Sequence, residues 1–270
     1  MLANVKSYRV KPEKLLVPMA KGESSKMAFD IAITIGKVYN SEITALTIKD
    51  EKKEITWSDK VSLVLGAYKE GKKNNVTVIP KVQSARSVKH GIVQEINTKN
   101  YDIVIFSSAP RTNLSSSLLG GIGDHIIKNA RTTVMAITNR KDRKGYKKII
   151  LPVCESLNTR KSVYIGLLMS NAMNAKINLV DMRKLDYKPT HGFKSLFDSM
   201  DNLKAEFPNV EMSTVERGEL KETIQSRIYS TGSELMILGV RPGTTGNIRI
   251  SGVVRTLIKE SWIDTALIKR

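Results

Sequence analysis

The chain has 270 residues, enough for two domains of ordinary size, and 41% of them are hydrophobic, which excludes a disordered polymer. No stretch reaches the roughly 18 consecutive apolar residues of a membrane span, and residues 1–14 lack the apolar region of a secretory signal. The net charge of +18 is spread over both halves, and the single cysteine, Cys154, excludes an internal disulfide.

The positive charge leaves two interpretations open. A basic surface can meet nucleic acid, anionic lipid headgroups or phosphorylated ligands, or it can simply keep the protein in solution. Neither an aromatic-rich RNA-binding motif nor a basic amphipathic helix accompanies the charge, so nucleic acid is not an expected partner. The lone thiol fits a reducing compartment, and we expect the protein in the cytoplasm, either free or at the inner face of the membrane.

The first half alternates short apolar runs with longer amphipathic stretches. Residues 24–39 carry Met27, Ile31 and Ile35 at helical spacing, and residues 89–100 form a shorter helix candidate. The apolar runs are continuous, as in strands buried on both faces of a sheet. They predict strands at 14–19, 42–48, 76–82, 102–107 and 132–137.

The second half repeats this pattern. Four apolar runs recur, with 14–19 matching 148–153, 41–48 matching 175–182, 101–107 matching 233–239, and 131–137 matching 263–269. The offset is 134 residues for the first two pairs and 132 for the last two. Such steady spacing predicts two copies of one domain, residues 1–139 and 146–270, joined by a polar, basic linker at 140–145.

Strands that alternate with helices indicate βαβ units and a parallel sheet. We therefore predict an α/β fold in each copy, with a five-stranded parallel sheet in the order 3-2-1-4-5 and helices on its faces. In such a sheet a ligand binds beyond the carboxyl ends of the strands, where the strand order reverses.

The loop after the fourth strand carries a spaced motif. In the first copy it reads Ser107-x2-Pro110-x9-Gly120-Gly121. The second copy keeps the spacing with Gly239, Pro242, Gly252 and Val253. This pattern resembles the Gly-x2-Gly-x9-Gly-Ser/Thr motif of the universal stress protein family, and the resemblance covers nearly the whole chain.

The resemblance implies an adenine nucleotide alpha hydrolase-like fold and a nucleotide site in the first copy. Its ligand is ATP, AMP or another nucleotide, with the phosphates over Gly120 and Gly121, where N–H groups at a helix start attract anions. Ser107 and Pro110 complete the loop. The base is expected against Met19, Ala20 and Thr47.

Several positions depart from the family pattern. The family has an Asp just past the first strand, where this chain has Ala20 and, in the second copy, Cys154. Pro110 removes a backbone donor, and Val253 brings bulk where a hydroxyl is usual. These departures weaken nucleotide binding, more so in the second copy.

No catalytic residue and no metal ligand is expected. A Gly-x4-Gly-Lys-Ser/Thr sequence and a carboxylate pair are both lacking, and His90, His125 and His191 have no metal-ligand spacing. Trp57 and Trp262 are expected to be packing residues and not stacking platforms for a ligand.

The sequence is compatible with three functions. The first is a non-catalytic binding or regulatory module, and the second is the cytosolic regulatory domain of an amino-acid or cation transporter fused to it in the same chain. The third is a slow ATPase. Because dimers of the family often pair through their fifth strands, we also expect strands 133–137 and 265–269 to pair as an intramolecular pseudo-dimer.

Overall fold

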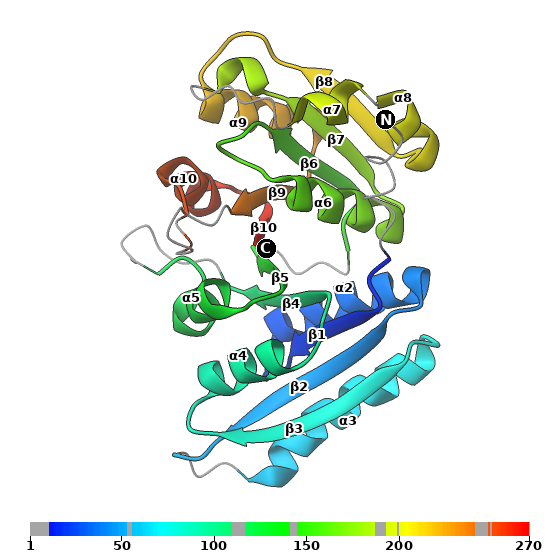
Figure 1. Cartoon of the computed structure of the whole chain (residues 1–270), viewed down its shortest axis with the longest axis vertical. Coiled ribbons are helices and arrows are strands. Elements are labelled where there is room, and N and C mark those ends of the chain that lie inside the picture. Colours follow the sequence, from blue (N-terminus) through cyan, green and yellow to red (C-terminus); the bar gives the residue numbers. More distant parts are fainter. Residues whose placement is uncertain are drawn as a thin grey trace. The chain divides into compact units, whose positions relative to one another are not determined.

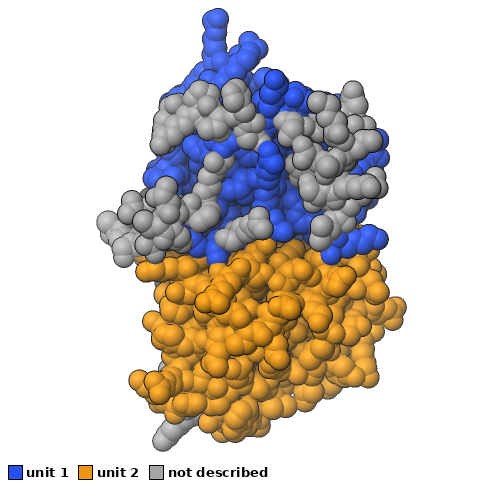
Figure 2. All heavy atoms as spheres, viewed as in Figure 1, with its two compact units in different colours: residues 1–11, 146–269 blue, residues 12–145, 270 orange. Residues whose placement is uncertain are grey.

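The computed structural model describes residues 11–52, 56–109, 117–140, 145–186, 193–198, 200–240, 248 and 250–269. The chain divides into two compact units, one from Pro12 to Gly145 and the other from Tyr146 to Lys269 (Figure 2). The predicted linker at 140–145 lies largely outside the described residues, and the predicted domain ends stay predictions.

The first unit is built on a parallel sheet with the order β3-β2-β1-β4-β5, which confirms the predicted topology. Its strands are β1 (Lys14–Pro18), β2 (Glu42–Asp50), β3 (Val78–Ala85), β4 (Ile103–Ser108) and β5 (Thr133–Thr138). The central strands are covered on both faces, so Leu15, Leu16 and Val17 of β1 are fully buried.

Helices cover both faces of this sheet. Figure 1 shows α2 (Glu23–Tyr39) and α3 (Trp57–Lys73) on one face, and α4 (Val88–Thr98) and α5 (Gly120–Asn129) on the other. The buried flank of α2 carries the apolar residues that its periodicity predicted, and the helix ends at Asn40 in the left-handed conformation.

Helix α3 was not predicted. Its buried flank consists of Val64, Ala67 and Gly71, and its charged residues obscure the period in the sequence. The Thr56 side chain caps its first turn by accepting a hydrogen bond from the Asp59 N–H.

Both tryptophans lie at the ends of elements and are half-exposed. Trp57 begins α3 and is 49% exposed, and Trp262 lies in the turn before the last strand and is 46% exposed. Each side chain is therefore only partly packed against the protein.

The second unit repeats the fold with the order β10-β9-β6-β7-β8. Its strands are β6 (Lys148–Val153), β7 (Lys176–Asp181), β8 (Val210–Thr214), β9 (Leu235–Val240) and β10 (Asp264–Lys269). Its helices are α6 (Arg160–Met173), α7 (Lys194–Asp198), α8 (Met200–Glu206), α9 (Leu220–Thr231) and α10 (Gly252–Glu260), with a short 3-10 turn, η1, at Arg183–Leu185. Among the described helices of both units, none has the length and apolar character needed to cross a membrane.

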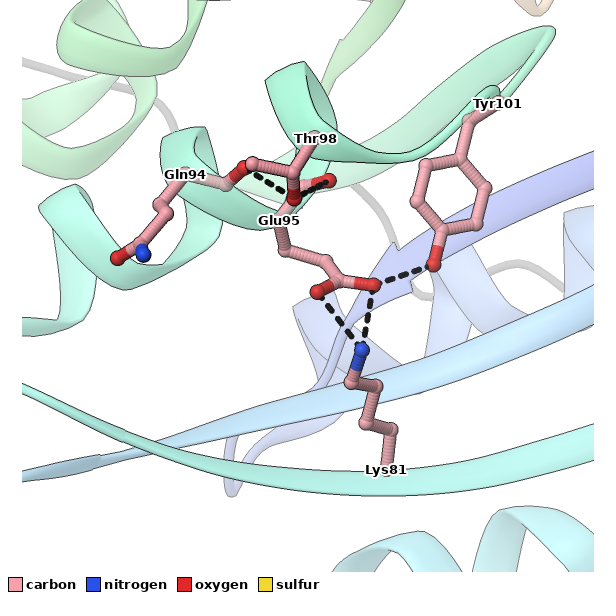
Figure 3. A network of polar contacts seen from close by, with 5 residues as sticks. All are labelled: Lys81, Gln94, Glu95, Thr98 and Tyr101. Atoms are coloured by element: carbon pink, nitrogen blue, oxygen red, sulfur yellow. Dashed lines mark hydrogen bonds and ion pairs between the residues drawn. The ribbon is translucent and has the colours of Figure 1, made fainter.

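A polar network anchors α4 to the first sheet (Figure 3). Lys81 Nζ on β3 donates to both carboxylate oxygens of Glu95 on α4 at 2.8 Å, and Tyr101 Oη donates to Glu95 Oε1 at 2.7 Å. The Glu95 side chain is 4% exposed, so its charge depends on these partners. Burial raises the pKa of Tyr101 well above its ordinary value; a hydrogen bond with Thr44 opposes this rise, and the hydrogen bond and charge of Glu95 add to it. The network therefore fixes α4, which forms one wall of the cleft described next.

Candidate ligand-binding site

A cleft of about 610 Å³ opens at the carboxyl ends of β1 and β4 in the first unit. The loop after β1, the first turns of α4 and α5, and the last residues of β4 form its walls. This is the point where the strand order of the sheet reverses, between β1 and β4, as predicted for a ligand in such a fold.

The end of β4 offers two buried hydroxyl groups. Ser107 and Ser108 both line the cleft, and their Oγ atoms are buried with no hydrogen-bond partner among the described residues. A buried polar atom without a partner costs about 1–3 kcal/mol. A polar ligand or water in the cleft would remove that cost.

The start of α5 exposes its backbone to the cleft. Gly120 has φ 80°, a left-handed conformation that favours glycine, and a Cβ added at Gly121 would have nothing within 4 Å. Among the described residues, no side chain caps this helix start. Asp124 accepts hydrogen bonds from the N–H groups of Leu118 and Leu119, which leaves the first helical N–H groups to face a ligand.

Hydrogen bonds from its backbone N–H groups hold the loop after β1 against β2 and α2. The Met19 N–H donates to the Leu46 carbonyl at 2.6 Å, and the Ala20 N–H donates to Ser25 Oγ at 2.9 Å. Ala20 is exposed and brings only a methyl group to the place where the family has a carboxylate. The side chain of Lys21 lines the cleft beside it.

The structure brings most of the predicted site residues together. Those that line the cleft are Met19, Ala20, Ser107, Gly120 and Gly121. Thr47 lies inside β2, which runs on to Asp50, and at 1% exposure it is not among the lining residues. Pro110 lies outside the described residues.

Ser108, Lys21 and Lys89 are among the polar lining residues that sequence reasoning missed. Ser108 directly follows a predicted residue and Lys21 follows Ala20, so chain proximity was a usable signal for both. Lys89 reaches the cleft only because α4 packs beside α5, and no local pattern reports that contact.

Two histidines that lie far apart in sequence meet on the surface of the first unit. The rings of His90 on α4 and His125 on α5 are 4.9 Å apart between centroids, in an edge-to-face arrangement. The described residues hold no group of three or more metal-ligating side chains, and His191 lies outside the part that the structure describes.

Cys154 follows β6 and is fully buried. Burial raises the pKa of its thiol to about 11, against the smaller effect of a hydrogen bond with Ser156. The thiolate is the reactive form, so this cysteine has the properties of a core residue and not of a nucleophile.

The corresponding position of the second unit is filled by its own loop, residues 154–159. The Gly239 N–H at the end of β9 donates to the Leu157 carbonyl at 2.8 Å. Asn158 Nδ2 donates to carbonyl oxygens of β6 and β9 at 2.5 and 3.1 Å, and Asn158 is 1% exposed. This loop is two residues longer than the one after β1, and the extra length covers the strand ends where a ligand would bind.

The fold and the cleft together define the class of the protein, an α/β protein with two doubly wound units. A putative universal stress protein from Pseudomonas aeruginosa UCBPP-PA14 shares the fold at 15% identity and a TM-score of 0.66, over 96% of this chain and 93% of that one. A universal stress protein from Archaeoglobus fulgidus DSM 4304 does so at 12% identity and a TM-score of 0.61, over 97% and 100% of the two chains.

Residues 12–138 match the sequence model of the universal stress protein family. This match over the first unit agrees with the resemblance that the motif spacing predicted, and the second unit repeats the same strand order. The cytoplasmic domain of a prokaryotic cation chloride cotransporter also shares the fold, at 12% identity and a TM-score of 0.60, over 96% of this chain and 95% of that one. Among curated proteins, none matches this sequence.

Proposed function

We propose that the chain is a non-catalytic binding module that takes an adenine nucleotide, such as ATP or AMP, in the cleft of the first unit. The observation that carries this proposal is the cleft itself, where the side-chain-free start of α5 faces the unpartnered hydroxyls of Ser107 and Ser108. Phosphate oxygens accept hydrogen bonds from such N–H and O–H groups.

The charge of the cleft supports an anionic ligand. Lys21 and Lys89 line it from two sides, and the N-terminal end of α5 adds the positive end of its dipole. The missing carboxylate at Ala20 removes one expected partner of the ribose and base, so affinity is expected to be modest. The second unit is expected to bind no nucleotide, because its own loop occupies the strand ends.

Calorimetry with ATP, ADP, AMP and cyclic dinucleotides tests the site. Gly121→Val places a side chain into open space in the cleft, so the fold is kept while the phosphate position is blocked. We expect at least about tenfold weaker binding, corresponding to the loss of one or two charge-assisted hydrogen bonds. Gly252→Val is the matched control, because a Cβ at that first residue of α10 also meets nothing within 4 Å. Equal weakening by both substitutions would move the ligand away from Gly121.

We further propose that bound nucleotide is not hydrolysed. Phosphoryl transfer needs a metal ion and a cation at the transferring group, and Ala20 supplies no carboxylate for a metal. Turnover of ATP is expected to stay below about 1 per minute, far under ordinary enzyme rates. Faster turnover that is lost in Gly121→Val and kept through repeated purification would establish the slow ATPase instead.

A second candidate function is the cytosolic regulatory domain of an amino-acid or cation transporter. It is favoured by the shared fold with the cotransporter domain, which extends over nearly the full length of both chains. In this case the protein acts in the cytoplasm at the inner face of the membrane. The open reading frame around the sequence decides the matter, since a transporter adds several apolar segments of about 20 residues.

A further inference from the structure

Helix α3 presents an apolar stripe that the described residues leave largely exposed. Trp57, Val61 and Leu65 recur every four residues and are 49%, 37% and 43% exposed. Tyr68, half-buried, continues the stripe by one more turn. Nine large apolar side chains are exposed among the described residues, and three of them lie in this one stripe, so it is not a random scatter of surface residues.

The stripe borders the flank that packs on the sheet. At about 100° per residue, the buried Val64 and Gly71 lie roughly 55° and 75° from the centre of the stripe. The apolar surface of the helix is therefore wider than the part that packs on the sheet, and its outer part stays exposed among the described residues.

Lysines stand at both ends of the stripe. Lys49 Nζ lies 5.6 Å from the centroid of the Trp57 ring, and Lys72 Nζ lies 4.7 Å from that of Tyr68. Neither lysine has a carboxylate partner among the described residues. Their charges are thus available to an anionic surface that approaches the stripe.

The acidic residues of α3 lie on the other flank and are compensated there. Asp59 forms an ion pair with Lys21 at 3.8 Å, and Glu70 forms one with Lys73 at 3.4 Å. Positive charge and apolar surface therefore share one side of the helix, and negative charge is kept to the other.

We propose that this α3 surface, made of Trp57, Val61, Leu65 and Tyr68 with Lys49 and Lys72, docks on an anionic lipid bilayer. The helix is 17 residues and so about 26 Å long, and the lysines at the two ends of its stripe complement the negative charge of an anionic bilayer. Aromatic rings with neighbouring lysines are typical of the headgroup region, where the rings enter the acyl boundary and the ammonium groups stay with the phosphates. This inference is independent of the nucleotide cleft.

The two tryptophans of the chain allow a direct test with the whole 270-residue chain. Trp262→Phe leaves Trp57 as the reporter on the α3 surface, and Trp57→Phe leaves Trp262, which is equally exposed. Vesicles of phosphatidylcholine with about 30% phosphatidylglycerol are expected to shift the fluorescence of Trp57 to the blue and to leave that of Trp262 unchanged. Vesicles of phosphatidylcholine alone are expected to produce a much smaller shift.

Co-sedimentation with the same vesicles tests the stripe itself. Leu65→Ser is expected to weaken binding about tenfold, because the exposed part of the apolar Leu65 side chain is no longer there to be buried in the bilayer. Val38→Ser is the matched control, because Val38 is 48% exposed on α2 and lies outside the α3 surface. Both substitutions replace exposed side chains, and circular dichroism checks that the fold is kept.

Three results would overturn the proposal. They are an equal shift of both tryptophans, no shift of either, and binding by Leu65→Ser that matches the unmutated protein. A different result would assign the α3 surface to a second copy of the chain. In that case the protein forms a dimer without lipid, Leu65→Ser abolishes the dimer, and vesicles shift neither tryptophan.

Discussion

At His125, two helices bring ionisable rings into contact. Asn129 lies 3.3 Å from His125 Nδ1 and donates to the His125 carbonyl oxygen at 2.8 Å, while Ser87 Oγ lies 2.8 Å from Nδ1 of the facing His90. Burial and then the nearby positive groups His90, Lys89 and Lys128 lower the pKa of His125 below its ordinary value. The folded protein therefore favours the neutral ring.

This lowered pKa predicts a loss of stability on acidification. The unfolded chain binds a proton at His125 at higher pH than the folded chain does, so the stabilising effect is complete above about pH 6.5 and is lost as the pH falls through the folded-state pKa. Urea unfolding between about pH 7.5 and pH 5 is expected to show a steeper loss of stability for the unmutated protein than for His125→Gln. Parallel pH profiles for the two proteins would contradict this account.

At the scale of elements, the attachment of α4 to β3 depends on one buried carboxylate. The Lys81 side chain is 34% exposed and that of its partner Glu95 only 4%, so removing the lysine leaves a charge in the interior. The pair between Lys176 and Glu211, which joins β7 to β8, has side chains that are 69% and 60% exposed. The two pairs thus link neighbouring elements in very different surroundings.

Lys81→Met is expected to lower the free energy of unfolding by about 2 kcal/mol. This is less than the full cost of leaving a buried charge without a partner, because Lys81 is partly solvated and Tyr101 still donates a hydrogen bond to Glu95. Lys176→Met, the matched control, should change it by less than about 1 kcal/mol. Chemical denaturation measures both. Similar values for the two variants would show that the Glu95 network is only a surface ion pair.

At the scale of the whole molecule, β5 and β10 each end the strand order of their own unit. Both are apolar, and an apolar edge with free N–H and C=O groups tends to associate. We propose that the two strands pair with each other as an intramolecular pseudo-dimer.

Hydrogen exchange resolved to single amides tests this pairing. In an unpaired edge strand every second N–H points to solvent, so alternate amides in 133–137 and 265–269 would exchange fast. We expect instead that all of them exchange as slowly as the amides of the central strand β1. An alternating pattern would show two free edges.

Much of this protein is determined by its sequence alone. Continuous apolar runs such as residues 14–19 predicted buried parallel strands, and the spacing from Ser107 to Gly121 predicted the family and the place of the cleft. These signals are local, because strand burial and loop length are properties of contiguous residues. The steady repeat offset then predicted the same fold for the second half of the chain.

Only the tertiary structure decided the rest, because it depends on contacts between elements that are distant in sequence. The packing of α4 beside α5 brings His90 to His125 and Lys89 into the cleft, and the length of β2 keeps Thr47 out of it. The loop 154–159 looks like any polar connection until its hydrogen bonds to the end of β9 show that it covers the second site. The way in which an amphipathic helix packs on its sheet likewise decides which of its flanks stays exposed. The sequence pattern by itself does not predict that flank.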